Sequence, residues 1–138
     1  MSNTTEQVSG SSEMTGPVGV ARQHGRGPAI WLAGDPEDLQ VWLPRGGHGI
    51  VTNTVVLNEM VQKYGPLTEL IKRYLDITDK PVVVEVDGHS TQELLDVSHV
   101  FTKMSSQIII KIPCAPHGLE AFSALSAEGV ETFCTTCF

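Results

Sequence analysis

Short apolar segments recur from residue 28 onward, and stretches with helical character separate them. The segments lie at residues 29–33, 49–52, 82–86 and 108–112, and a last one starts at residue 130. Pro81-Val-Val-Val-Glu-Val and Gln107-Ile-Ile-Ile-Lys-Ile are apolar on both faces, which is typical of parallel strands covered by helices. The pattern therefore predicts an α/β fold with about five parallel strands and intervening helices.

The stretches between these segments carry signals for helix starts and stops. Asp35-Pro36-Glu37-Asp38 places acidic residues in the first turn of a short helix, and Ser90-Thr91-Gln92-Glu93 is a capping box. A helix over residues 55–76 is expected to break near Tyr64-Gly65-Pro66. A last helix, at residues 116–128, should end at Gly129.

Two architectures fit this order of elements: an open doubly wound sheet and a partial (β/α)8 TIM barrel. An open sheet that binds nucleotides should carry a glycine-rich loop after its first strand. The corresponding segment, Leu32-Ala33-Gly34-Asp35-Pro36, has one glycine, which favours the barrel over residues 28–138. Residues 1–27 are rich in Ser, Thr, Gly and Gln without periodicity, and they predict a disordered tail.

Composition and charge narrow the class of protein. The formal net charge of −7 argues against a nucleic-acid or anionic-membrane partner. No apolar run approaches the ~18–20 residues that would span a bilayer. The three cysteines are an odd number and all lie within residues 114–137, so we expect no disulfide framework and a cytoplasmic location.

Glu85 and Lys111 are charged residues inside apolar strands. A lysine at a strand end can reach solvent past its neighbours, whereas a desolvated amine can attack a carbonyl group. Strand alternation puts Val83 with Glu85 on one face, and Ile109 with Lys111 on one face of the next strand. In a barrel both faces point inward, near the strand ends where active sites gather. The two residues predict either a shared site or a structural ion pair.

Three further features carry weaker signals. Thr52-Asn53 ends the second strand, where the side chains can hold substrate hydroxyls, although Asn53 can equally cap the next helix. Thr135 is ambiguous, because threonine is a good strand residue. Cys134-Thr-Thr-Cys137 resembles a redox pair, but in a strand the two side chains should face opposite sides. The five histidines show no metal-ligand spacing.

Taken together, these residues resemble the transaldolase family, including its branch of fructose-6-phosphate aldolase-like enzymes. The order of the matching segments, and the 26 residues from Glu85 to Lys111, make the resemblance fairly specific. The matching segments are Gly49-Ile50-Val51-Thr52-Asn53, Val84-Glu85-Val86-Asp87, Ile109-Ile110-Lys111-Ile112-Pro113, Gly118-Leu119-Glu120-Ala121 and Ala127-Glu128-Gly129-Val130.

The resemblance implies a class I transaldolase or aldolase of carbohydrate metabolism, in the pentose phosphate pathway. Lys111 would form a Schiff base with a ketose or ketone donor, a small sugar or its phosphate. Glu85 with Thr135 would position a water for proton transfer. Asn53, beside Thr52, would bind a donor hydroxyl. The resemblance implies no metal and no organic cofactor.

Two departures from the family pattern leave an alternative open. Ala33 stands where the family carries an aspartate, and Asp35 is the candidate to replace it. The chain stops in the fifth strand of an eight-stranded barrel, so we expect a homo-oligomer or a second chain to complete it. The alternative is a non-catalytic binding or regulatory subunit, or a pseudoenzyme, that keeps the fold. An exposed Lys111 would instead favour an unrelated α/β domain.

Overall fold

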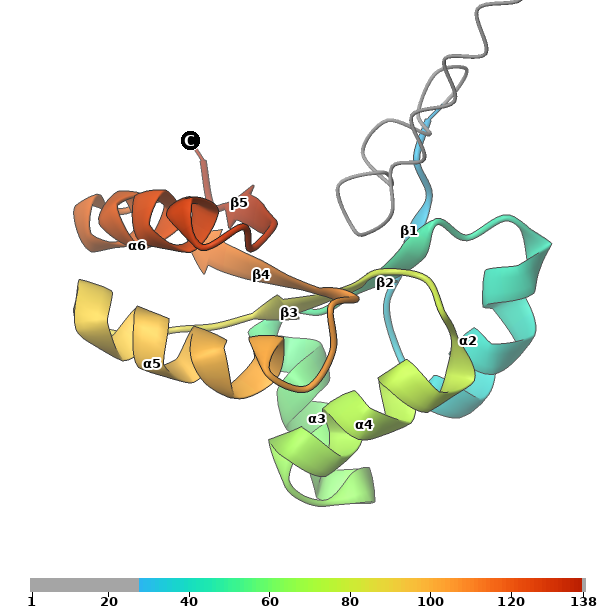
Figure 1. Ribbon diagram of the computed structural model, residues 1–138. Helices are drawn as coiled ribbons and strands as arrows, with labels where there is room; N and C mark the ends of the chain where they lie inside the picture. The colour runs from blue at the N-terminus through green and yellow to red at the C-terminus, as the bar shows by residue number, and fades with distance from the viewer. Residues whose placement is uncertain (1–27, 138) are drawn as a thin grey trace, which may run out of the picture.

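Five short strands form one parallel sheet in the computed structural model, which describes residues 28–137. Neighbours in the sheet are also neighbours in the sequence, so the spatial order is β1-β2-β3-β4-β5 (Figure 1). The strands are β1 (Trp31–Leu32), β2 (Gly49–Val51), β3 (Val82–Glu85), β4 (Ile108–Pro113) and β5 (Thr132–Thr135). This order confirms the predicted α/β fold and the partial barrel, in which β1 and β5 do not pair with each other.

Helices connect successive strands, as the sequence pattern predicted. The predicted interruption between α3 and α4 is confirmed, because Gly65 ends α3 with a left-handed φ of 94°. Ser90 caps α5 by accepting the Glu93 N–H, as predicted from the capping box. The helices are α2 (Pro36–Trp42), the 3-10 turn η1 (Leu43–Arg45), α3 (Thr54–Tyr64), α4 (Leu67–Ile77), α5 (Thr91–Thr102) and α6 (Pro116–Ala127).

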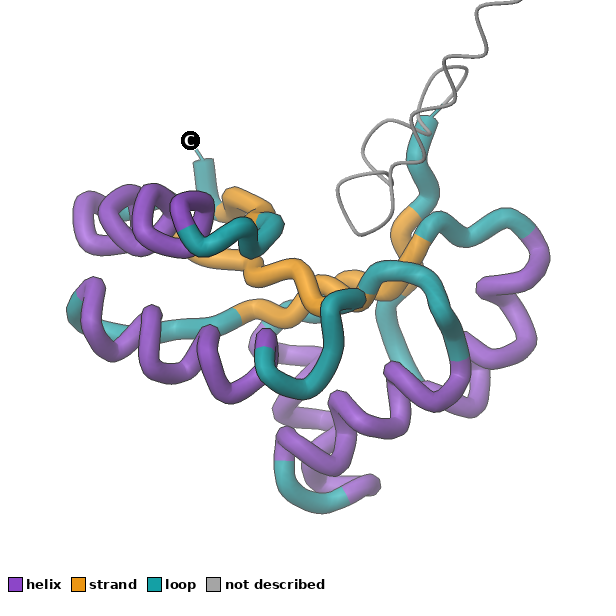
Figure 2. The backbone as a smooth tube through the Cα atoms, in the orientation of Figure 1, coloured by secondary structure: helices purple, strands orange, loops and turns teal. Residues whose placement is uncertain are grey.

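The core lies between the helices and one face of the sheet. Figure 2 shows the helices along the outer side of the strands. Alternate residues of the central strands point into this layer, where burial of each large apolar side chain contributes about 1.5–3 kcal/mol. The sheet residues of the core are Val82, Val84, Ile108, Ile110 and Ile112, and helical residues packed with them include Leu70, Tyr74, Leu94 and Leu125.

The opposite face of the sheet is the inner face of the partial barrel. Trp31 of β1 and Phe133 of β5 meet edge to face there, with ring centroids 6.3 Å apart. Because β1 and β5 are the two outermost strands, this contact means that the sheet curls toward a barrel. Gly49 leaves room for the indole, since a Cβ at this position would lie 2.5 Å from a Trp31 ring carbon.

The first and fifth strands differ most from the prediction, and the other three differ by one residue at one end. The first strand is limited to Trp31–Leu32 instead of residues 29–33. The fifth begins at Thr132 instead of residue 130, because the Val130 N–H still donates to Leu125 O at the end of α6. The predicted disordered tail, residues 1–27, lies outside the described residues. None of the helices in residues 28–137 is long and apolar enough to cross a membrane.

Candidate active site

Lys111 and Glu85 lie side by side on the inner face of the sheet. They are register partners in the parallel pairing of β3 with β4, so their side chains share a face. The Lys111 Nζ lies 3.1 Å from Glu85 Oε2, and each side chain is only 12% exposed. The structure therefore brings the predicted amine and carboxylate together in a largely dry position and does not support a solvent-exposed lysine.

Thr52 links β2 to this pair through both its side chain and its main chain. Its buried hydroxyl donates to Val83 O at 2.9 Å and accepts the Glu85 N–H at 3.0 Å. Its carbonyl oxygen accepts a hydrogen bond from Lys111 Nζ at 3.1 Å. The amine is thus held between a carboxylate and a carbonyl oxygen, while the Thr52 hydroxyl joins two strands.

Glu85 has one oxygen that is incompletely satisfied. Oε2 is buried and lacks a hydrogen bond among the described residues, although it lies within ion-pair distance of Lys111 Nζ. The contact is therefore electrostatic without hydrogen-bond alignment. A buried acceptor in this state is costly unless a donor reaches it. The donor group beside it is the Lys111 ammonium, 3.1 Å away.

Asn53 and Thr135 flank the pair at the carboxyl edge of the sheet. Asn53 is exposed, and its Oδ1 accepts the Val56 N–H at 2.9 Å, which makes it the N-cap of α3. Its amide NH2 remains the part of the side chain that can face a ligand. Thr135 is the register partner of Pro113, two residues beyond Lys111, so it lies on the same face as the lysine.

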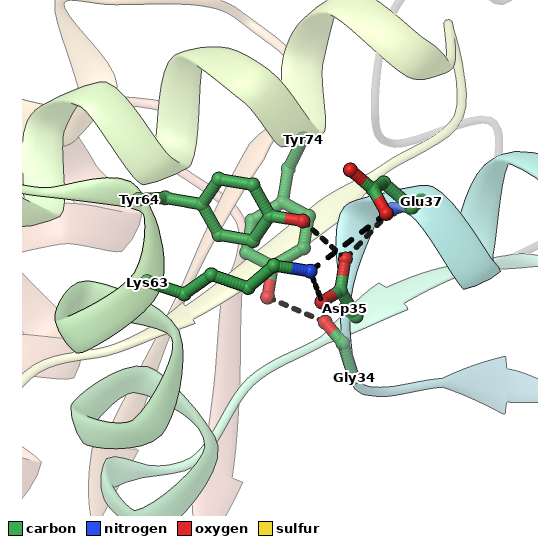
Figure 3. Close-up of polar contacts among 6 residues, drawn as sticks. All are labelled: Gly34, Asp35, Glu37, Lys63, Tyr64 and Tyr74. Atoms are coloured by element: carbon green, nitrogen blue, oxygen red, sulfur yellow. Dashed lines mark hydrogen bonds and ion pairs between the residues drawn. The ribbon is translucent and has the colours of Figure 1, made fainter.

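Asp35 belongs to a different cluster, between the start of α2 and the helices α3 and α4 (Figure 3). Its Oδ1 accepts the Glu37 N–H at 2.9 Å, so it caps α2, and also the Tyr64 hydroxyl at 2.5 Å. The Lys63 Nζ lies 2.7 Å from the other oxygen. Tyr74 supports the same loop by donating to Gly34 O at 2.7 Å.

The charge of Asp35 is stabilised within this cluster. Burial acts to raise its pKa, but the hydrogen bonds from Lys63, Tyr64 and the Glu37 amide outweigh burial. The pKa of Asp35 therefore lies below its ordinary value of 3.8. The same contacts hold the pKa values of Lys63 and Tyr64 above their ordinary values, chiefly through the hydrogen bond to Asp35. These contacts tie the start of α2 to the end of α3.

The expectation that Cys134 and Cys137 face opposite sides is wrong. Their sulfurs are 3.2 Å apart, because β5 ends at Thr135 and Thr136 turns the chain with a φ of 54°. Cys114, which follows β4, lies beside them, and the three sulfurs are within 4.8 Å of one another. The hydrogen bond with Cys137, burial and the nearness of Cys114 raise the pKa of the Cys134 thiol to about 12.

Sequence reasoning missed the partners of Asp35 and the third cysteine of this cluster. Lys63 and Tyr64 are separated from Asp35 by 28 and 29 residues, and no local pattern links them. Cys114 and Cys134 are neighbours only because β4 and β5 pair in parallel. One sequence signal could have placed these two cysteines side by side. If the predicted fourth and fifth strands are paired in parallel and the pairing is continued past their ends, Cys114 and Cys134 become neighbours.

Comparison with known proteins identifies the family. Residues 57–138 match the family model described as Transaldolase/Fructose-6-phosphate aldolase. A probable transaldolase 2 of Listeria monocytogenes and a probable transaldolase of Thermoplasma volcanium are each 31% identical over 90 residues. A probable transaldolase of Aquifex aeolicus is 28% identical over the same length. In each case the match covers 65% of this chain and 40% of the relative.

The chain thus spans about two fifths of the length of these relatives. The matched region contains β3, β4 and β5, and with them Glu85, Lys111 and Thr135. The family model covers more than half of the chain. The chain therefore belongs to the transaldolase/fructose-6-phosphate aldolase family.

Proposed function

We propose that Lys111 forms a Schiff base with a ketose or ketone donor and that the protein thereby cleaves or transfers carbon–carbon bonds. The observation that carries the proposal is the Lys111–Glu85 pair, 3.1 Å apart and nearly excluded from solvent on the inner face of the sheet. Membership of a family described by transaldolase and fructose-6-phosphate aldolase supports a small sugar or sugar phosphate as the substrate class.

The chemistry begins with the amine of Lys111. Only the neutral amine can attack, so the ammonium first gives a proton to a nearby base, and Glu85 is at hand. The amine adds to the carbonyl carbon, and loss of water leaves an iminium. Cleavage of the bond between the α and β carbons then sends its electron pair into the iminium to give an enamine. The β-hydroxyl gives its proton to a base and becomes the carbonyl group of the released aldehyde.

Proton transfer at the imine needs a water molecule that can both donate and accept a proton. In our proposal this water lies between the Glu85 carboxylate and the Thr135 hydroxyl. The position of Glu85 beside Lys111 on the inner face of the sheet supports this role. Asn53 would offer its amide NH2 to a donor hydroxyl, while its Oδ1 caps α3. Thr52 would act through its carbonyl oxygen, which holds the Lys111 amine.

Completion of the barrel is a further part of the proposal. Within residues 28–137, β1 and β5 each pair on one side only, and the inner face between them is not closed by further strands. We propose that additional strands close the barrel in the functional protein, whether they belong to the same polypeptide, to another copy or to a complementary chain. Such strands would pair with the free edges and exclude water from Lys111.

The second candidate is a non-catalytic binding or regulatory subunit, and one observation favours it. Ala33 directly follows β1, and the carboxylate of Asp35 is bound by Lys63 and Tyr64. Asp35 would have to release both partners before it could replace the aspartate of the family. Without such a carboxylate, the imine can form while cleavage of the carbon–carbon bond is slow.

Borohydride trapping tests imine formation. The protein is incubated with dihydroxyacetone or fructose 6-phosphate, reduced with borohydride and analysed by intact mass and peptide mapping. We expect one covalent adduct on Lys111 that is absent from Lys111→Met. The exposed Lys103 provides the matched control, and Lys103→Ala should trap the donor as the parent protein does.

Three outcomes separate the candidates. An adduct on Lys111 together with release of an aldehyde from fructose 6-phosphate supports the enzyme. An adduct without aldehyde release supports the non-catalytic subunit. If circular dichroism shows a folded protein and no adduct forms at Lys111 with either donor, the Schiff base is refuted.

A further inference from the structure

Three thiols converge at the carboxyl edge of the sheet, outside the proposed carbonyl chemistry. The sulfurs of Cys114, Cys134 and Cys137 all lie within 4.8 Å of one another, and all three residues are exposed. These are all the cysteines of the chain. No metal was expected from the sequence, where the histidines show no ligand spacing and Cys134-Thr-Thr-Cys137 was considered as a redox pair.

Paired strands hold two of these thiols in place. Cys134 lies within β5 as the register partner of Ile112. The Cys114 N–H donates to Thr135 O at 2.8 Å, which extends the pairing of β4 with β5 past the end of β4. The position of these two thiols is therefore set by the backbone of the sheet, and little ordering is needed to bring them to a common ligand.

A tight turn brings in the third thiol. Thr136 adopts a left-handed φ of 54°, which is uncommon for a residue with a branched side chain. Its hydroxyl donates to Thr135 O at 2.8 Å. As a result the chain folds back at the end of β5, and the Cys137 sulfur comes within 3.2 Å of the Cys134 sulfur.

The spacing of the sulfurs suits one shared ion. With Zn–S bonds of about 2.3 Å, the thiolates of a tetrahedral site lie about 3.8 Å apart. Here the Cys134 and Cys137 sulfurs are 3.2 Å apart, and all three sulfurs lie within 4.8 Å of one another. Small side-chain rotations would equalise these distances. A disulfide would instead join two of the sulfurs by a bond of about 2.05 Å and leave the third thiol unused.

We propose that Cys114, Cys134 and Cys137 form a binding site for a thiophilic metal ion, Zn²⁺ in the first place. Thiolate ligands select soft ions, and three of them leave a fourth position for water or an external ligand. The three thiols lose their protons on binding, so the bound ion neutralises two of the three negative charges. This site does not depend on whether Lys111 forms an imine.

Metal titration of the untagged full chain, reduced with a phosphine, tests the site. Native mass spectrometry should show one Zn²⁺ per chain, and Cd²⁺ should give the ultraviolet sulfur-to-metal charge-transfer absorption of thiolate ligands. Loss of residues that merely support a ligand weakens metal binding by about 10–100-fold. Each of Cys114→Ser, Cys134→Ser and Cys137→Ser should therefore weaken it by about 100-fold or more.

A matched control separates thiol binding from adventitious binding by imidazole. His89 is exposed, and His89→Ala should bind Zn²⁺ as the parent chain does. The proposal is overturned if the reduced chain binds no Zn²⁺ at about 10 μM, well above the dissociation constants of structural zinc sites. It is also overturned if Cys114→Ser binds as tightly as the parent, or if a Cys134–Cys137 disulfide persists under the reductant.

Discussion

Substitution of Asp35 by alanine should destabilise the protein without affecting the chemistry of Lys111. The change removes the cap of α2, which contributes about 1 kcal/mol. It also removes the hydrogen bond from the Tyr64 hydroxyl to a charged carboxylate, a type of bond that contributes about 1.5–3 kcal/mol. The ion pair with Lys63, which is 49% exposed, adds at most about 1 kcal/mol. We expect a loss of about 3 kcal/mol.

Urea unfolding followed by circular dichroism measures this loss. The midpoint should fall while the slope of the free energy against urea stays the same, because the surface exposed on unfolding does not change. Asp35→Asn keeps a capping oxygen and an acceptor for Tyr64, so it should lose about half as much. Asp38→Ala is the matched control: this exposed acid in the same first turn should cost less than about 1 kcal/mol.

The stabilisation should also depend on pH in a defined direction. Because the pKa of Asp35 is lower in the folded protein than its ordinary value of 3.8, its charge stabilises the fold fully above that value. The contribution is lost as the pH falls from 3.8 through the lowered pKa. The difference between the parent protein and Asp35→Ala should therefore be constant near neutral pH and shrink in acid.

Two results would refute this reasoning. A loss of less than about 1 kcal/mol in Asp35→Ala would mean that the contacts in Figure 3 contribute little to stability. Unchanged stability combined with loss of the borohydride-trapped adduct would mean that Asp35 acts at the Lys111 site. Tyr64→Phe separates the hydrogen bond from the cap, because it removes the hydroxyl and leaves the cap of α2 intact.

Three further changes probe the inner face of the sheet. Glu85→Gln should slow formation of the Lys111 adduct by about 100-fold, because an amide cannot take up a proton. An unchanged rate of adduct formation in single-turnover trapping would exclude Glu85 from proton transfer. Thr52→Val should lower the free energy of unfolding in urea by about 1–3 kcal/mol, because the Glu85 N–H of β3 loses its acceptor. An unchanged free energy of unfolding would contradict the linking role of the Thr52 hydroxyl. Gly49→Ala should destabilise by about 1–3 kcal/mol, since the new methyl group would collide with both the Trp31 ring and the Pro81 carbonyl oxygen. Equal thermal stability would contradict this close approach.

Much of the fold could be predicted from local sequence. Apolar runs with a charge near their carboxyl ends marked β3 and β4, and the capping box at Ser90 and the break at Gly65 were found where predicted. Alternation with a period of two residues placed Glu85 and Lys111 on equivalent faces. These features are predictable because they depend on neighbours only a few residues apart in the chain.

The tertiary structure decided which of these side chains meet. The register of β3 against β4 sets Glu85 opposite Lys111, and the curl of the sheet brings Trp31 to Phe133. The tertiary structure also turns Asp35 toward Lys63 and Tyr64 at the end of α3. Residues far apart in sequence make these contacts, so no local period encodes them.

The cysteines show most clearly which features follow from local sequence and which depend on the tertiary structure. Sequence alone established that three thiols lie near the end of the chain, and strand alternation indicated that Cys134 and Cys137 should point apart. Alternation holds only while the strand continues, and β5 ends at Thr135. The left-handed turn at Thr136 and the pairing of β4 with β5 then bring Cys137 and Cys114 to Cys134. Sequence thus determined the elements and their faces, whereas the strand ends and the register, which depend on the packed sheet, determined the sites.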